Sequence, residues 1–254
     1  MKVTSRSDQT LRATACRALA LAGAMAIALA AAAGSPTAHA AAADDVASLY
    51  GPQPPADATF LRVVNLSEQT AKVALPSGGH LVDLAPGTAS RLDVVRPGTP
   101  LRVTVDAGEP KGEAGGAKVA GADTVGETLT VALERDEAGS WHARPIAAPV
   151  SSTDALRAQL RLFNFVEGCD GKVALERNPA SAIFSDVAAG HAASRSINPV
   201  TATLVAVCGA AVSPPFALPR LAAGQSFSLF LSGSPARPVL SGALDTLEWP
   251  GRKP

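Results

Sequence analysis

The sequence predicts an all-β protein, with two tandem antiparallel β-sandwich domains that follow a cleaved signal peptide. Three observations lead to this fold class. Residues 1–40 have the features of an export signal, two later stretches repeat the same motifs in the same order, and apolar residues alternate with polar ones along many short segments. Such alternation is typical of strands that are buried on one face only.

The N-terminal segment is interpreted as a signal peptide. Basic residues at its start precede an apolar, alanine-rich run at 18–33, and the triplet 38–40 (Ala-His-Ala) provides a cleavage site. The run is shorter than the roughly 20 apolar residues of a membrane-spanning helix. We therefore expect an exported, periplasmic protein that does not itself span the membrane, with an uncleaved anchor as the alternative.

The charge balance of the mature chain excludes a general attraction to polyanions. The whole chain has 22 basic and 22 acidic residues. Residues 1–40 contain four basic residues and one acidic residue, which leaves 18 against 21 and a net charge of −3 after cleavage. This balance provides no field for nucleic acid or anionic membranes, although a few local arginines can still bind an anionic polymer.

Two cysteines, Cys169 and Cys208, remain after cleavage of the signal peptide. An even count in an oxidising compartment favours a disulfide, which in the chain-entropy model stabilises a loop of this size by roughly 4 kcal/mol. A redox pair and a zinc site are the weaker alternatives, because the chain has no Cys-x-x-Cys motif and its mature histidines are scattered.

An internal duplication divides the mature chain. Several motifs recur in the same order about a hundred residues later, which is a common domain size. The matches pair 60–65 (FLRVVN) with 159–164 (QLRLFN), 72–75 with 172–175 (both KVAL), and 83–87 (DLAPG) with 186–190 (DVAAG). The offset is too long for a solenoid unit, so the pattern indicates two copies of one domain.

The duplication sets the predicted domain boundaries. We expect a first β-sandwich over 56–143 and a second over 156–249, joined by a proline-stiffened linker at 144–155. Within the first copy, the stretch 108–126 is rich in glycine, alanine and lysine and is predicted to be a long loop. The remaining segments are an N-terminal extended segment at 41–55 and a short tail at 250–254.

Alternating apolar residues predict the strands of each copy, and Gly- or Pro-bearing turns separate them. A capped helix over 152–163 is an alternative, because Leu156, Leu160 and Phe163 share one helical face. The duplication favours a strand from about Gln159 instead. The predicted strands are, in order, 60–64, 91–94, 101–105, 129–133, 159–163, 204–207 and 227–231.

The sequence predicts no catalytic residue, no cofactor and no metal site. Serine hydrolases and acyltransferases need a nucleophile, a base and an orienting acid, yet His80, His142 and His191 lie in no such motif and are interpreted as turn or strand-end residues. No Gly-x-Ser-x-Gly elbow, phosphate loop or dinucleotide fingerprint occurs. The acidic stretch 134–137 is interpreted as a solvated turn with no setting that would raise a pKa.

Several sequence blocks resemble those of a known family. Residues 49–52 (Leu-Tyr-Gly-Pro) precede the 60–65 block, and 197–200 (Ile-Asn-Pro-Val) follow the 160–164 block (LRLFN). In this order the blocks resemble the AlgF family of alginate O-acetylation proteins, over most of the mature chain from about residue 50 to 231. Two features depart from the family pattern, namely the 108–126 stretch and the cysteine pair.

The resemblance implies a periplasmic, non-catalytic adaptor that is required for O-acetylation of an exopolysaccharide. Its expected partners are periplasmic acetyltransferases of the serine-esterase type and a membrane-bound acyltransferase, with the polysaccharide as a further candidate. Alginate is the expected polymer. The alternatives are the same adaptor role in cellulose acetylation and a stand-alone polysaccharide-binding protein.

Four residues are candidates for partner or polymer contact. Tyr50 lies on the extended segment before the first strand, where a tethered aromatic makes a good anchor. Arg62 and Arg161 fall on the polar side of predicted strands, where their guanidinium forks suit carboxylates. Asn198 belongs to the Ile-Asn-Pro-Val block. The alternatives are a solvated sheet face for the arginines and packing against its own domain for Tyr50.

Overall fold

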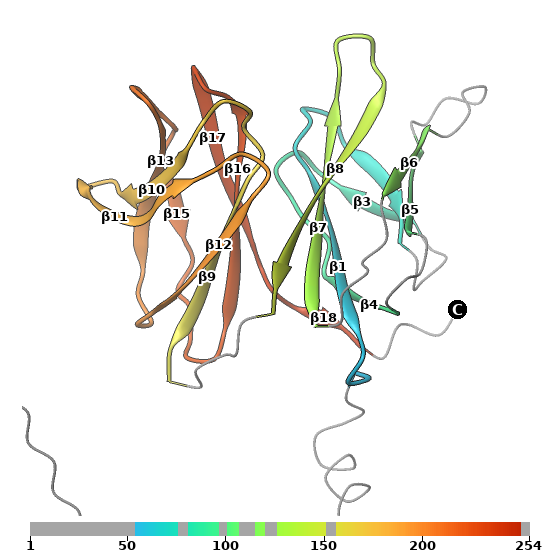
Figure 1. Cartoon of the computed structure of the whole chain (residues 1–254), viewed down its shortest axis with the longest axis horizontal. Coiled ribbons are helices and arrows are strands. Elements are labelled where there is room, and N and C mark those ends of the chain that lie inside the picture. The colour runs from blue at the N-terminus through green and yellow to red at the C-terminus, as the bar shows by residue number, and fades with distance from the viewer. Residues whose placement is uncertain are drawn as a thin grey trace, which may run out of the picture. The chain divides into compact units, whose positions relative to one another are not determined.

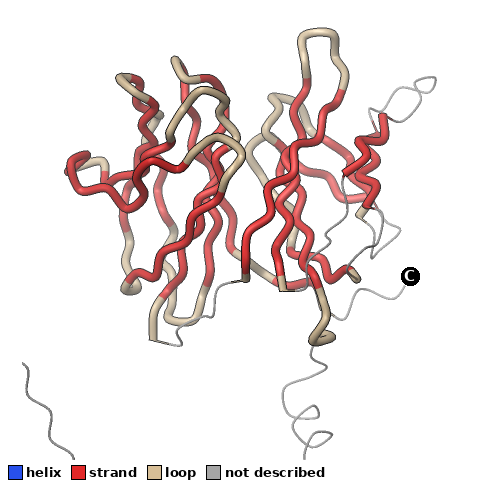
Figure 2. Tube along the Cα trace, viewed as in Figure 1, coloured by secondary structure: helices blue, strands red, loops and turns tan. Residues whose placement is uncertain are grey.

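The described part of the chain consists of strands joined by turns and irregular segments (Figures 1 and 2). The computed structural model describes residues 54–75, 81–96, 101–106, 115–119, 126–150 and 156–249. No helix occurs in these ranges, which confirms the all-β class, and none there could cross a bilayer as a long apolar helix. The predicted signal peptide, Tyr50, His80 and the tail at 250–254 lie outside the described residues.

The first half forms two sheets, which we call the β1 sheet and the β2 sheet. In the β1 sheet, β1 pairs antiparallel with β4 and parallel with β7, and β7 pairs antiparallel with β8. In the β2 sheet, β2 pairs with β3 and β5, and β5 pairs with β6, all antiparallel. The strands are β1 (Thr59–Asn65), β2 (Ala71–Ala74), β3 (Leu81–Leu84), β4 (Leu92–Val95), β5 (Leu101–Asp106), β6 (Gly115–Val119), β7 (Glu127–Arg135) and β8 (Trp141–Pro149).

The second half repeats this arrangement in the β9 sheet and the β10 sheet. There β9 pairs antiparallel with β12 and parallel with β16, β16 pairs with β17, and β10 pairs with β11 and β13. The shorter β14 and β15 both pair with β13. The strands are β9 (Ala158–Asn164), β10 (Gly171–Leu175), β11 (Asn178–Val187), β12 (Ala192–Ile197), β13 (Ala202–Cys208), β14 (Ala211–Val212), β15 (Phe216–Leu218), β16 (Ser226–Ser234) and β17 (Arg237–Leu244).

The last strand, β18 (Leu247–Glu248), leaves the second half and pairs with the first. It runs parallel to β4 on the outer edge of the β1 sheet, and the Leu92 N–H donates to the Thr246 carbonyl at 2.8 Å. All described strands lie within one compact unit, Asp44–Pro254.

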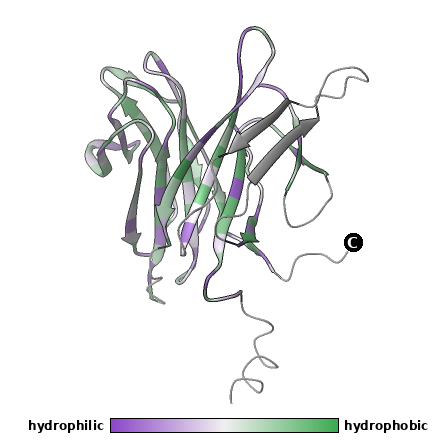
Figure 3. Ribbon diagram, turned by 45° about the vertical axis from the view of Figure 1, so that its right-hand side comes forward, coloured by the Kyte–Doolittle hydropathy of each residue, from purple (hydrophilic) through white to green (hydrophobic). Residues whose placement is uncertain are grey.

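Each half has its own apolar core between its two sheets. The alternation along β1 turns Leu61 and Val63 inward, where they meet Val73 of the opposite sheet and Val131 of β7. Leu160, Leu162, Leu204 and Leu229 are among the residues that make the corresponding core of the second half. Apolar residues therefore lie along the strands of both halves, with polar residues between them (Figure 3).

A buried asparagine ends the first strand of each copy. The Asn65 amide donates to the Leu84 carbonyl at 2.8 Å, and the Asn164 amide donates to the Val187 carbonyl at 2.8 Å. In both cases the side-chain oxygen accepts a backbone N–H two residues later, so the side chain satisfies the polar groups of the turn. This role gives a physical reason for the shared asparagine of the two repeat blocks.

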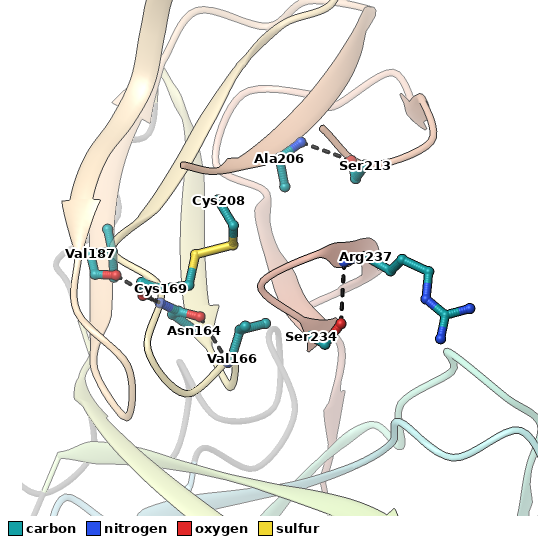
Figure 4. Close-up of a disulfide and its surroundings, with 9 residues drawn as sticks. All are labelled: Asn164, Val166, Cys169, Val187, Ala206, Cys208, Ser213, Ser234 and Arg237. Atoms are coloured by element: carbon teal, nitrogen blue, oxygen red, sulfur yellow. Dashed lines mark hydrogen bonds between the residues drawn. A yellow bond between two sulfur atoms is a disulfide. The ribbon is translucent and has the colours of Figure 1, made fainter. Parts of the chain in front are cut away.

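The structure joins Cys169 to Cys208 in a disulfide within the core of the second half (Figure 4). Cys169 lies in the turn before β10 and Cys208 ends β13, and the Asn164 amide donates to the Cys169 carbonyl at 2.7 Å. The bond therefore ties the turn after β9 to the opposite sheet.

Two predicted boundaries are wrong in part. The predicted loop 108–126 contains β6, whose small residues pair with β5 through the backbone and give no apolar alternation. The predicted linker 144–155 begins as strand, because β8 continues to Pro149. β8 is an edge strand of its sheet, and an edge strand tolerates prolines that a central strand would not.

The outer faces of the β1 and β9 sheets pack against each other. Val64 and Ile146 of the first half belong to the same buried cluster as Phe163, Phe165 and Phe230 of the second. The rings of Phe163 and Phe230 lie 6.0 Å apart. Strand positions that the sequence marks as outward-facing are therefore buried between the two halves.

A buried ion cluster lies in this interface. The Asp245 carboxylate, whose side chain is 2% exposed, contacts Arg62 at 2.5 Å and Arg161 at 3.0 Å. It also accepts the Ser228 hydroxyl at 2.8 Å, and Arg161 donates to the Thr128 hydroxyl of the first half at 3.0 Å. Burial, together with the nearby Arg62, lowers the pKa of Arg161, and Asp245 opposes that shift.

Arg62 and Arg161 are thus not surface residues. The prediction of partner or polymer contact for them is wrong, because they are 0% and 5% exposed and share one carboxylate. They occupy equivalent positions, since Arg62 lies beside Thr130 of β7 and Arg161 beside Ser228 of β16. The two copies therefore meet through the same side of the same strand.

We expect Asp245→Asn to destabilise the protein by about 3–5 kcal/mol, because it leaves two buried guanidinium groups without a counter-charge. Urea unfolding of the oxidised protein measures the loss. Asp83→Asn is the matched control, since Asp83 and Lys72 form an exposed pair at 3.0 Å and its loss should cost about 0–1 kcal/mol. Equal effects of the two changes would contradict the structural role of the buried cluster.

Removal of the disulfide by Cys169→Ala with Cys208→Ala should lower the free energy of unfolding by about 4 kcal/mol, because the bond closes a separation of 39 residues. Both side chains are buried, so alanine avoids a new unpaired polar group. The measurement is urea unfolding of the variant beside the oxidised and the reduced wild type. Unchanged stability on reduction would argue against the bond.

Candidate functional site

An open groove lies at the junction of the two halves, with a volume of about 770 Å³. Residues of both halves line it, so neither copy forms it alone. The first half supplies the turn after β1, the end of β7, the β7–β8 turn and one residue of β8, and the second half supplies the segment after β9 and the β16–β17 turn. The lining residues are Leu66, Ser67, Glu68, Gln69, Glu134, Arg135, Asp136, Glu137, Ala138, Gly139, Arg144, Phe165, Glu167, Gly233, Ser234 and Pro235.

The β7–β8 turn holds one wall of the groove. The Asp136 carboxylate accepts the Ser140 N–H at 2.8 Å, and Arg135 donates to the Gly139 carbonyl at 2.8 Å and to the Gln69 side chain. Gly139 has a φ of 85°, a conformation that residues other than glycine rarely adopt. The side chains that face the groove are therefore held by a hydrogen-bonded turn.

Arg144 connects the two halves at the centre of the groove. Its guanidinium lies 3.4 Å from Glu134 of the first half and 3.6 Å from Glu167 of the second. It also donates to the Phe165 carbonyl and lies over the Phe165 ring, 5.8 Å from the centroid. One side chain thus contributes an ion pair to each half and a cation–π contact.

Two carboxyl groups of the groove have shifted pKa values. Burial raises the pKa of Glu134 and the neighbouring Glu167 adds to this, while Arg144 and His142 oppose the shift. The hydrogen bond from His142, at 2.7 Å, lowers the pKa of Asp136. The prediction that 134–137 is a solvated turn with no setting that would raise a pKa is therefore wrong for Glu134, a partly buried residue of the groove lining.

The groove carries an excess of negative charge. Five carboxylates, those of Glu68, Glu134, Asp136, Glu137 and Glu167, face two guanidinium groups, those of Arg135 and Arg144. Within a Debye length of about 8–10 Å such a set repels polyanions and attracts cations. The groove is therefore suited to a basic segment of a protein rather than to an acidic polymer.

A second cleft, of about 290 Å³, lies between the edges of β11 and β12. Arg195 of β12 spans it and donates to the carbonyls of Ala182 and Ile183, at 3.3 and 2.8 Å. Arg157 and Asn198 lie at its rim, and both are exposed. Neither aspartate nor glutamate occurs among the residues that line it: Arg157, Ser181, Ala182, Ile183, Arg195, Ser196, Ile197 and Asn198.

The predicted contact residues do not share one site. Asn198 is at the β11–β12 cleft, whereas Arg62 and Arg161 are in the buried interface. His142 is exposed at the start of β8 and contacts Asp136, whereas His191 is exposed just before β12 and contacts the Ala189 carbonyl. In the part of the chain that the structure describes, no predicted histidine meets another.

Sequence reasoning missed the residues that join the halves. Glu134 and Arg144 meet on neighbouring strands of the β7–β8 hairpin, whereas Glu167 reaches Arg144 only because the two copies pack face to face. Asp245 lies between Leu244 and Thr246 near the end of the second copy, and no motif marks it. The arginine that both repeat blocks place within a strand could have indicated the buried cluster. Two buried arginines require a counter-charge.

Comparison with solved structures shows distant likenesses. No protein-family model matches the chain, and no curated protein matches it. Among solved structures, the C-terminal domain of AlgF from P. aeruginosa is 21% identical, over 35% of this chain and 98% of that chain, with a TM-score of 0.31.

Two other solved structures are similar over more of the chain. A cell adhesion protein from Bacteroides ovatus is 9% identical, over 77% of this chain and 99% of that one, with a TM-score of 0.25. A CBM26-family module from Eubacterium rectale, in complex with maltoheptaose, is 11% identical over 74% and 95%, with a TM-score of 0.24. These TM-scores are too low to support an argument about function.

The raised pKa of Glu134 gives a pH dependence with a defined sign. The folded state holds this proton more tightly than the unfolded state, whose ordinary value is 4.5. Glu134 therefore costs stability as pH rises through the interval between the ordinary and the raised pKa. Glu134→Gln removes this cost, so its unfolding free energy should exceed that of the wild type increasingly as pH rises from about 4 to 7.

Urea unfolding at a series of pH values measures this difference. Glu137→Gln is the control, because Glu137 lies in the same turn and is exposed. It should follow the wild type across the series. An advantage of Glu134→Gln that shrinks as pH rises would show that the sign is wrong.

Proposed function

We propose that this chain is a non-catalytic accessory protein of exopolysaccharide O-acetylation in the periplasm. It would act as an adaptor, holding periplasmic acetyltransferases of the serine-esterase type near a membrane-bound acyltransferase that supplies acetyl groups. The support from sequence is the ordered set of AlgF-like blocks, of which 60–65 and 160–164 form the first strands of the two copies. Alginate is the proposed polymer, and cellulose is the alternative.

The observation that carries the proposal is the junction groove. The buried Asp245 cluster and the shared aromatic cluster join the two copies, and the groove is built from both. A surface that two joined copies form together is suited to binding a partner in one orientation. Its excess of carboxylates favours a basic segment of that partner.

The first experiment compares a strain that lacks this gene with its complemented parent. Polymer that is still secreted but has lost its acetyl groups supports the proposal, and the sugar composition then separates alginate from cellulose. Normal acetyl content in the deletion strain would falsify the O-acetylation role. That result would favour a binding or structural role for the protein.

Charge reversal in the groove tests where the partner binds. Glu68→Lys with Glu137→Lys places two positive charges at exposed positions of the groove and leaves the Arg144 ion pairs in place. We expect association with the partner to slow by about tenfold, because electrostatic complementarity mainly sets the rate of encounter. Acetyl content of the polymer should fall accordingly in a strain that carries this variant.

Glu176→Lys is the control for the groove variant. Glu176 is exposed and lies next to the end of β10, outside the groove. This change should leave acetylation as in the parent. Equal loss from both variants would point to a general charge effect and would remove the groove as the binding site.

A further inference from the structure

In the first copy, a short strand from elsewhere in the same chain pairs with the edge of a sheet. β18 extends the β1 sheet on the outer side of β4, with Leu247 beside Leu92 and Glu248 beside Asp93. The Glu248 carboxylate then lies 3.2 Å from the Arg91 guanidinium. A short acidic strand thus binds by backbone pairing and by one charge–charge contact.

The equivalent edge in the second copy carries no added strand among the described residues. β12 corresponds to β4, because Leu160 lies beside Arg195 as the equivalent Leu61 lies beside Asp93. β12 is the outermost strand of its sheet. The second copy therefore lacks what β18 provides in the first.

The free edge has backbone groups available for pairing. The Asn164 N–H donates to the His191 carbonyl at 3.0 Å, and in an antiparallel pair the residues alternate between facing the neighbour and facing away. This alternation directs the backbone N–H and C=O of Arg195 toward β9. It leaves the backbone N–H groups of Ser194 and Ser196 on the outer edge. Ser194 then corresponds to Leu92, whose N–H donates to the added strand in the first copy.

Among the described residues, the lining of the cleft at this edge is positively charged. Arg157 and Arg195 both line the β11–β12 cleft, and no lining residue is acidic. Arg91 of the first copy, in contrast, pairs with Glu248. Two guanidinium groups in a cleft whose described lining holds no carboxylate favour a ligand that brings carboxylates.

We propose that the outer edge of β12 binds an extended acidic peptide segment of a partner protein. The segment runs parallel to β12, as β18 runs parallel to β4. Its backbone pairs with the outward N–H groups of Ser194 and Ser196, and its carboxylates contact Arg157 and Arg195. The identity of the partner rests on the proposed adaptor function, whereas the binding mode rests on the strand edge alone.

A synthetic peptide of alternating glutamate and threonine residues tests the proposal against the same peptide with lysine in place of glutamate. The protein is the full mature chain, and fluorescence anisotropy measures binding. We expect the glutamate peptide to bind and the lysine peptide to fail. Arg157→Gln with Arg195→Gln should weaken binding by about tenfold or more, since it removes charge-assisted hydrogen bonds.

Two further variants separate the backbone from the charge. Ser196→Pro removes an outward N–H that β9 does not use, so it should weaken the glutamate peptide while the fold persists, because edge strands tolerate proline. Arg220→Gln is the control, an exposed arginine outside the cleft, and should bind as the wild type does. Loss of binding in Ser196→Pro supports backbone pairing if the unfolding midpoint of this variant matches that of the wild type. If the midpoint is lowered, the test rests on the double arginine variant.

Three outcomes would overturn the proposal. The glutamate peptide does not bind, or it binds the double arginine variant as well as the wild type. Alternatively, a uronate oligosaccharide binds through the two arginines and ignores Ser196→Pro, which would assign the cleft to an acidic polymer. If the peptide binds and the deletion strain still acetylates its polymer normally, the edge site stands and the adaptor function is wrong. If the peptide does not bind and the deletion strain loses acetyl groups, the adaptor function stands and the edge site is wrong.

Discussion

The arrangement of the molecule depends on one carboxylate shared by two buried arginines. Arg62 and Arg161 come from equivalent strands, and Asp245 lies between them in the interface. Without that charge, packing the two outer sheet faces together would desolvate two guanidinium groups, which costs more than the aromatic contacts nearby can return. The pairing of the copies, and with it every feature built from both, follows from this cluster.

The cluster breaks the symmetry of the duplication. In the first copy Ala148 lies opposite Thr128, and in the second copy Asp245 follows β17 at the corresponding position, where its N–H donates to the Ser226 carbonyl. Alanine in one copy and aspartate in the other place a single negative charge between two equivalent positive ones. An aspartate at position 148 as well would add a second buried negative charge to the interface. The difference between Ala148 and Asp245 is therefore a feature that the interface requires.

The sequence predicts the long strands β1, β7, β9 and β16 well, because apolar residues alternate along them and the repeat blocks mark β1 and β9. Prediction fails where the second face is also buried, as at Arg62 and Arg161, because a polar residue on an alternating strand normally faces solvent. It fails too at β6 and β8, whose glycines and prolines hide strands that are held by backbone pairing. The junction groove could not be predicted, since Glu167 meets Arg144 only after the copies have packed.

The two candidate surfaces arise from different consequences of duplication. The groove exists because the copies are joined, and it is acidic since the turn after β7 adds Asp136 and Glu137 to the ion pairs of Arg144. The β12 edge differs from its counterpart because β18 pairs with β4, whereas no described strand pairs with the outer side of β12. Opposite charges on the two surfaces mean that a basic and an acidic segment would be directed to different places on one protein. Duplication of one domain design thereby accounts for two candidate surfaces, one formed where the copies join and one at an edge where the copies differ.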